Sequence, residues 1–452
     1  MSFEWPRTTF DQLCDIKRGA SPRPIHDWLA PTGIPWVKIS DATASTSPFI
    51  SKTAEFIRPE GAKKSVEVFP GDFILSNSAT PGIPKFMQIH ACVHDGWMLL
   101  RNFRGLDQWY CYYLLQTERE NLIRQGNGSV FTNLKTEILK KHEVIVPPLD
   151  YQKQVAAFLR TLDDRIALLR ETNATLEAIA QALFKSWFVD FDPVRAKMEG
   201  RTPEGMDEAT AALFPDGLET SELGAVPRGW VLKPFGALLA HSIGGDWGSE
   251  QPEEKNTVRV AIIRGTDIPD LQNGRDNRVP IRYTSEKKLS TRQLQDGDIV
   301  IEVSGGSKDQ PTGRALYVTD DLLKRFDCPV EPASFCRLFR PVDRATGVLL
   351  GQHLRFIYNQ GKTWEYQNQS TGIANFQTTH FLEKELVAVP PDSVLNVFSE
   401  IVRALVDRTL TIQIDELTQI RDTLLPRLIS GQLRLPEAQA TTEAALGGVP
   451  QA

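Results

Sequence analysis

Cysteines are few and long apolar runs are missing from this chain of 452 residues. The five cysteines, an odd number, form no Cys-x-x-Cys pair, which argues against a disulfide scaffold and favours a reducing compartment. No apolar run approaches the roughly 18 residues that a membrane helix requires. The start, MSFEWPRTTF, lacks the basic and then apolar pattern of a secretory signal. We therefore expect a cytoplasmic protein.

Positive charge is also in short supply. The formal net charge is -6, whereas general binders of polyanions are usually basic. Much of the imbalance lies in residues 191–226, where eight acidic residues stand against three basic ones. The remainder is nearly neutral, so nucleic-acid binding would depend on arginines and lysines gathered locally.

Familiar catalytic motifs are absent as well. The sequence contains no HExxH, GxSxG or GxxxxGK[ST], and its Pro-Pro pairs follow valines rather than the Asn or Asp of amino-methyltransferases. His90, Cys92 and His94 alternate along one segment, but a fourth metal ligand is not apparent. A half-buried strand is the better interpretation of that segment, and we expect no catalytic residue and no metal site in this chain.

One weak pattern keeps an enzymatic alternative open. Asp270, Glu286 and Lys288 resemble the acidic pair plus lysine of metal-dependent nucleases, whose carboxylates hold the ion that activates water. Such spacing arises readily by chance in a chain of which 24% of the residues are charged. A self-sufficient nuclease would cleave DNA with metal alone and lose that activity in a Glu286→Ala variant.

An internal repeat organises the chain. EWPRTTFDQL matches GWVLKPFGAL at an offset of 225, and WVKISD matches IIRGTD at 226. FPGDFIL matches QDGDIVI at the same offset, and VIVPPLDYQKQVAAFL matches LVAVPPDSVLNVFSEI at 243. Because the features follow the same order in both halves, the sequence predicts two copies of one structural unit.

Each copy contains short β-type segments, bounded by Gly, Pro, Asn and Asp, and then a long helical pattern. We predict an α+β fold in which two similar globular domains are joined by two long antiparallel helices about a pseudo-two-fold axis. The expected parts are a first recognition domain (1–149), a first long helix (150–190), an acidic connector (191–226), a second recognition domain (227–391), a second long helix (392–432) and a disordered tail (433–452).

The first long helix shows apolar positions at alternating steps of four and three, which is typical of a coiled coil. The second is less regular, because its apolar positions fall into two sets of different phase, and Pro426 should kink or end it. Aromatic residues broaden the apolar face of the first helix, so packing on a globular core is the alternative. The expected seam comprises Val155, Leu159, Leu162, Ile166, Leu169, Asn173, Leu176, Leu183, Trp187, Phe398, Leu405, Ile412, Leu417 and Leu424.

Polar loops recur within both copies and combine Arg, Lys, Asn, Gln, Ser and Gly, as in KRGASPRP and VSGGSKDQPTGR. Such side chains can hydrogen-bond base edges in DNA, although any single one can equally be a solvated turn residue. The candidates for DNA contact are Arg18, Arg23, Lys38, Ser40, Ser78, Thr80, Lys85, Asn127, Ser129, Arg264, Thr266, Ser304, Ser307, Lys308, Arg314, Gln369 and Ser370.

Several stretches resemble the specificity subunits of type I restriction-modification systems. They are GIPWVKISD, VPPLDYQKQVAAF, ALFKSWFVDFDPVRAKMEGRTPEGMDEATAALFPD, ELGAVPRGW and LLPRLISGQL, and the resemblance runs from about residue 3 to 435. It implies two target recognition domains that each read one half of a bipartite site in double-stranded DNA, with a helical spacer that sets the gap.

The resemblance also implies partners. Two methyltransferase subunits would dock around the helices and two ATP-dependent restriction and motor subunits would lie outside them, so S-adenosylmethionine, ATP and magnesium would belong to those partners. The chain itself would be a non-catalytic subunit. A non-catalytic coiled-coil scaffold is the alternative, and it predicts no sequence-specific DNA binding even with a methyltransferase present.

Overall fold

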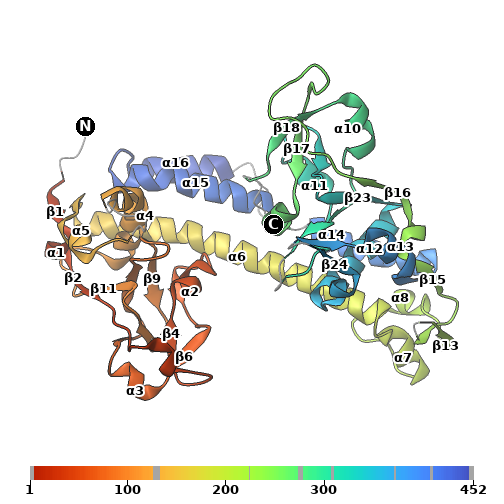
Figure 1. The fold of residues 1–452 in the computed structure, drawn as a ribbon, viewed down its shortest axis with the longest axis horizontal. Coiled ribbons are helices and arrows are strands. Elements are labelled where there is room, and N and C mark those ends of the chain that lie inside the picture. Colours follow the sequence, from red (N-terminus) through yellow and green to blue (C-terminus); the bar gives the residue numbers. More distant parts are fainter. Residues whose placement is uncertain are drawn as a thin grey trace. The chain divides into compact units, whose positions relative to one another are not determined.

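The computed structural model describes residues 5–125, 133–222, 224–272, 278–306, 310–370, 373–407 and 411–446. It divides into a first unit, residues 1–167 with 416–452, and a second unit, residues 168–415. Figure 1 shows helices and sheets in both units, in agreement with the predicted α+β class. Within the described ranges, no helix is long and apolar enough to cross a membrane.

Two twisted sheets form the globular part of the first unit. One has the order β3 (Leu29–Ala30), β6 (Glu55–Ile57), β4 (Ile34–Val37), β10 (Ala91–Val93), β7 (Val66–Val68). The other has the order β2 (Asp15–Arg18), β11 (Trp97–Arg101), β8 (Phe73–Ser76), β9 (Pro84–Met87), β5 (Phe49–Ile50). β1 (Arg7–Thr9) pairs antiparallel with β12 (Glu143–Ile145). The helices are α1 (Phe10–Leu13), α2 (Ile39–Thr43), α3 (Pro59–Ala62), α4 (Gln108–Gln125) and α5 (Thr136–Lys141).

The second unit repeats this plan with shorter sheets. Its strand orders are β16 (Leu239–Gly244), β23 (Cys336–Pro341), β19 (Ile299–Glu302), β21 (Ala315–Tyr317), then β18 (Ile281–Thr284), β17 (Val258–Ile263), β22 (Val330–Pro332), and β20 (Ser304–Gly305), β25 (Ile373–Phe376), β24 (Gln367–Ser370). β15 (Val231–Pro234) pairs antiparallel with β26 (Leu386–Val389), as β1 does with β12. The helices are α9 (Ile268–Gln272), α10 (Glu286–Arg292), α11 (Asp320–Leu323), α12 (Arg344–Asn359) and α13 (Thr378–Lys384).

The first long helix is α6 (Leu149–Phe188), drawn in yellow as one continuous ribbon in Figure 1. Its 40 residues include no Gly or Pro, and Pro147-Pro148 stand directly before its start, as suits a helix N-terminus. The buried amide of Gln152 donates to the carbonyls of Pro147 (2.8 Å) and Gly105 (2.9 Å) and so ties the first turn to the globular part. At 1.5 Å per residue the helix is about 60 Å long.

The second long helix is divided. α14 (Asp392–Asp407) and α15 (Thr411–Ile429) are separate elements, and the change of apolar phase in the sequence falls between them. Pro426 lies inside α15, which ends three residues later at Ile429.

Each piece runs antiparallel to part of α6 within its own unit. In the first unit, Arg421 Nη1 of α15 lies 2.7 Å from Asp163 Oδ1, and Tyr151 donates to the Leu428 carbonyl at 3.2 Å. In the second unit, Phe188 stacks edge-on against Phe398 of α14, with ring centroids 4.6 Å apart.

The seam positions differ in burial. Asn173, Leu176, Leu183 and Leu405 are half-buried, and the side chain of Ile412 lies outside the described part of the chain. The buried members are Val155, Leu159, Leu162, Ile166, Leu169, Trp187, Phe398, Leu417 and Leu424. Towards its C-terminal end α6 joins a globular core, where Phe184, Trp187 and Phe188 pack with Phe214 and Trp230. A narrow seam and a broad core face therefore follow one another along one helix.

One expectation is wrong. The tail is not disordered over 435–446, because α16 (Leu435–Leu446) forms there and Ala438 is fully buried in the core of the first unit. The acidic connector is itself structured, and its residues Val194, Phe214 and Val226 are buried in the core of the second unit. It contains α7 (Asp192–Met198), α8 (Glu208–Ala212), β13 (Leu218–Ser221) and β14 (Gly224–Pro227). In both segments a few apolar side chains among acidic or small ones were enough to anchor the chain.

Candidate nucleic-acid interface

Matching turns follow β4 in the first unit and β17 in the second. The backbone N–H of Lys38 donates to Asp41 Oδ2 at 2.7 Å, and that of Arg264 donates to Asp267 Oδ2 at 2.9 Å. Each turn thus closes on an aspartate three residues ahead and presents one long basic side chain. The alignment of WVKISD with IIRGTD is therefore repeated in the hydrogen bonds.

The two basic side chains have acidic neighbours. Lys38 Nζ lies 2.6 Å from Glu55 Oε1, and its side chain is 45% exposed. Arg264 Nη2 lies 2.7 Å from Asp267 Oδ1, and its side chain is 35% exposed. The Lys38 pair is half-exposed on both sides and contributes little to stability, so Lys38 can exchange Glu55 for a DNA phosphate or base at small cost. Asp267 is 2% exposed and binds Arg264 through both carboxylate oxygens, so Arg264 is held more firmly.

A hollow of about 780 Å³ opens beside Lys38 in the first unit, and its lining includes Arg23, Trp36, His94 and Asp95. Asp95 organises one wall, because its side chain accepts from Ser21 Oγ (2.8 Å) and Arg23 Nη2 (3.1 Å). Its backbone carbonyl accepts from Arg18 Nε (2.8 Å) and Asn77 Nδ2 (3.1 Å). The structure thus brings the predicted residues Arg18, Arg23 and Lys38 to one region.

His94 adds a neutral donor to this hollow. The Gly96 N–H donates to His94 Nδ1 at 2.9 Å, which places the ring proton of the neutral form on Nε2. Burial lowers the pKa of His94, against the opposing charge of Asp95, so the neutral form prevails at pH 7. The sequence predicted a half-buried strand for the segment that holds His94 and did not single out His94, Trp36 or Asp95 as binding residues; the Asp-Gly pair at 95–96 was the available turn signal.

The loops after β8 and β19 correspond too. In the first unit, Ser76 Oγ accepts from the Ile83 N–H at 2.8 Å and donates to the Thr80 carbonyl at 2.6 Å, so it braces the loop that carries Ser78 and Thr80. The equivalent position in the second unit is Glu302, which is buried.

Arg314, predicted to contact DNA, instead pairs with Glu302. Its Nε and Nη2 donate to the two carboxylate oxygens at 2.8 and 2.6 Å, and its side chain is 14% exposed. A Cβ at Gly265 or Gly305 would lie 2.4 or 2.5 Å from Glu302 Oε1, so this ion pair supports both loops from below. A buried carboxylate thus occupies the guanidinium of Arg314, and its contact with DNA stays a prediction.

Lys85, also predicted to contact DNA, has its partners within the protein. It lies in β9 with 4% of its surface exposed, and its ammonium donates to the carbonyls of Ser45 (3.0 Å) and Ser47. Burial lowers the pKa of Lys85 to about 8. The side chain thus fastens the 45–47 segment and is not available to a ligand.

The other candidate residues vary in exposure. Ser40 and Thr266 are exposed; Ser78, Thr80 and Ser304 are half-buried, and Ser304 Oγ donates to Asn375 Oδ1 at 2.9 Å. Outside the described residues or side chains lie Asn127, Ser129, Ser307, Lys308, Gln369 and Ser370. Their role in DNA contact stays a prediction.

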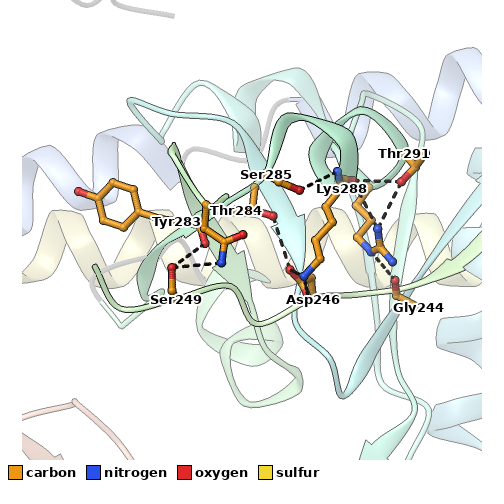
Figure 2. A network of polar contacts seen from close by, with 10 residues as sticks. Gly244, Asp246, Ser249, Tyr283, Thr284, Ser285, Lys288 and Thr291 are labelled. Atoms are coloured by element: carbon orange, nitrogen blue, oxygen red, sulfur yellow. Dashed lines mark hydrogen bonds and ion pairs between the residues drawn. The ribbon is translucent and has the colours of Figure 1, made fainter. Parts of the chain in front are cut away.

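The nuclease-like pattern does not assemble. Figure 2 shows Lys288 Nζ directed at Asp246, with the nearest oxygen at 2.9 Å, while Asp270 lies 3.5 Å from Arg278. His90, from the alternating His-Cys-His segment, pairs with Glu67 at 2.8 Å. In the described part of the chain, no group of three or more His, Cys, Asp and Glu side chains is placed to hold a metal ion.

Known proteins are similar to this chain over most of its length. Residues 4–178 match the family described as Type I restriction modification DNA specificity domain. The chain is 24% identical over 448 residues (96% of this chain, 94% of the relative) to the type I restriction enzyme MjaIX specificity subunit of Methanocaldococcus jannaschii. It is 27% identical over 362 residues (70% of this chain, 74% of the relative) to the HindI specificity subunit of Haemophilus influenzae.

One solved structure supports the fold. It is the S subunit of a type I restriction-modification system from M. genitalium, with a TM-score of 0.53 and 16% identity over 94% of this chain and 96% of that one. The family match covers the first unit's recognition fold, and the relatives extend the similarity through the second copy. Over most of its length the chain is therefore similar to the specificity subunits of type I restriction-modification systems.

Proposed function

We propose that this chain is the DNA-recognition subunit of a type I restriction-modification complex, with each globular unit reading one half of a bipartite target. The proposal rests on one observation: the two units have the same hydrogen-bonded turns at equivalent positions, but the exposed side chains on those turns differ. Lys38 and Arg264 sit on equivalent hydrogen-bonded turns but differ in chemistry. A lysine offers a point charge, whereas an arginine can bind guanine through two hydrogen bonds, so the two half-sites should differ.

The long helices are proposed to act as a spacer and as the docking surface for partners. Leu168 and Ile179 of α6 are 59% and 47% exposed, and 11 residues are close to three helical turns, so both lie on one face of the helix. Exposed apolar side chains at such spacing favour contact with another helix. Two methyltransferase subunits are the proposed partners there, with two restriction and motor subunits beyond them.

Catalysis is assigned to those partners in this proposal. S-adenosylmethionine would serve adenine methylation in the methyltransferase subunits, and ATP with magnesium would serve the restriction and motor subunits. This chain would contribute binding and positioning, so it would not act as an enzyme by itself. A cytoplasmic location, where the complex would meet chromosomal DNA, completes the proposal.

The test is co-expression with a type I methyltransferase subunit and mapping of methylated adenines across the host genome. A split motif with a constant gap, present only when both chains are expressed, is the expected result. The methyltransferase subunit alone serves as the control. A stable complex that adds no methylation would contradict DNA recognition and favour a scaffold.

A further inference from the structure

The turn that joins β10 to β11 has an equivalent between β22 and β23. In the first unit the Trp97 N–H donates to the His94 carbonyl (3.1 Å), and in the second the Cys336 N–H donates to the Ala333 carbonyl (2.8 Å). The Asn77 N–H donates to the Gly96 carbonyl (2.8 Å), as the Val303 N–H does to that of Phe335 (2.9 Å). Position by position, His94 thus corresponds to Ala333, and Gly96 to Phe335.

The ring and the small residue stand at opposite positions in the two turns: the first turn has His94 and Gly96, and the second has Ala333 and Phe335. A Cβ at Gly96 would lie 2.2 Å from His94 Cε1 and 2.5 Å from Ser78 Oγ, so the imidazole occupies the space of a side chain at position 96. In the second unit, Ala333 has no ring, and the ring is carried instead by Phe335. Each turn therefore presents one ring, a polar one in the first unit and an apolar one in the second.

Phe335 is 64% exposed, more than any other large apolar side chain in the described part of the chain. Its surroundings are polar: Ser334 beside it is exposed, and the Ser304 N–H donates to the Phe335 carbonyl at 3.2 Å. Ser304 is one of the predicted DNA-contacting residues, and Arg264 precedes Gly265, which packs on the same buried Glu302 as Gly305. The phenyl ring thus stands among the loops proposed to face DNA.

We propose that Phe335 contacts a base in the half-site read by the second unit, by stacking on it or by packing against a thymine methyl group. Both contacts are known uses of exposed aromatic side chains in nucleic-acid recognition. This inference rests on the proposed function. DNA is favoured over a protein partner for the following reason. Two identical protein partners, one on each unit, would require similar side chains on the two equivalent turns. Two different DNA half-sites require different side chains there, as His94 and Phe335 are.

The experiment compares methylation by complexes that contain the wild type, Phe335→Ala, Phe335→Tyr or Val342→Ala. Val342 is a matched control, because it is 53% exposed and lies just beyond the opposite end of β23. We expect Phe335→Ala to relax the motif at one position of one half-site and to weaken binding of a target duplex about tenfold. Phe335→Tyr keeps the ring and should retain most of the activity, and Val342→Ala should match the wild type.

Other outcomes overturn the inference. An unchanged motif and unchanged binding in Phe335→Ala would show that the ring does not touch DNA, while a split motif in the wild type would leave the proposed function standing. Loss of the methyltransferase subunit from the Phe335→Ala complex would make this residue a protein contact instead. If the wild type itself yields no split motif, both the proposed function and this inference fall.

Discussion

A buried carboxylate holds together several elements of the second unit, and its removal gives the sharpest test of the fold. Glu385, 1% exposed, lies directly after α13. It accepts hydrogen bonds from His353 Nε2 (2.8 Å), Lys362 Nζ (2.9 Å) and Tyr366 OH (2.6 Å). Burial raises the pKa of Glu385, but the hydrogen bond and charge of His353, with the bonds from Lys362 and Tyr366, outweigh it and lower the pKa from 4.5 to about 2.

This shift sets the expected magnitude and its pH dependence. A difference of about 2.5 pKa units corresponds to about 3 kcal/mol that favours the folded state when the carboxyl is ionised. Because the folded pKa is the lower one, this contribution is complete above about pH 4.5 and is lost as the pH falls towards 2. We expect Glu385→Gln to lower the free energy of unfolding by about 3 kcal/mol at pH 7, and the difference from wild type to shrink below pH 4.5.

Urea denaturation followed by tryptophan fluorescence measures this difference. Glu383→Gln is the matched control, since Glu383 is exposed near the end of α13, two residues before Glu385, and should change stability by less than about 0.5 kcal/mol. A loss below about 1 kcal/mol for Glu385→Gln, or a difference that grows on acidification, would refute the reasoning.

Three further predictions concern other parts of the molecule. Arg314→Ala should lower stability by about 3 kcal/mol, because Glu302 is left buried without its partner; a changed DNA motif at unchanged stability would restore Arg314 as a reader. Ala438→Asp should undock α16 and cost about 2 kcal/mol in urea denaturation, whereas exposed Ala440→Asp should cost little. Seven residues inserted after Glu171, with a matching insertion at the start of α15, should widen the gap between the methylated half-sites by about three base pairs, because a heptad lengthens a helix by about 10 Å. An unchanged gap would contradict the proposal that the helices set the spacing.

Periodic and repeated features were predictable from the sequence. The first long helical pattern became α6, and the Pro-Pro pairs directly precede α6 and α14. These signals are local, because a helix repeats its apolar positions every three or four residues and proline limits where it can begin.

The choice among polar loop residues was less predictable. Arg314, Lys85 and Arg23 are all basic residues in stretches that the sequence predicts as polar loops. Lys85 is buried and the side chain of Arg314 is 14% exposed, whereas that of Arg23 is 78% exposed. The difference lies in partners that are distant in sequence, such as the carbonyls of Ser45 and Ser47 for Lys85.

The sequence by itself determined the two-copy organisation, the α+β class and the long helices, because these follow from patterns that repeat along the chain. Only the tertiary structure decided which side chains are available to a ligand. His94 and Gly96 show the reason: a side chain at position 96 would collide with the His94 ring and Ser78 Oγ, so the space there is set by neighbouring side chains. Packing in three dimensions, which no linear pattern encodes, sets that choice.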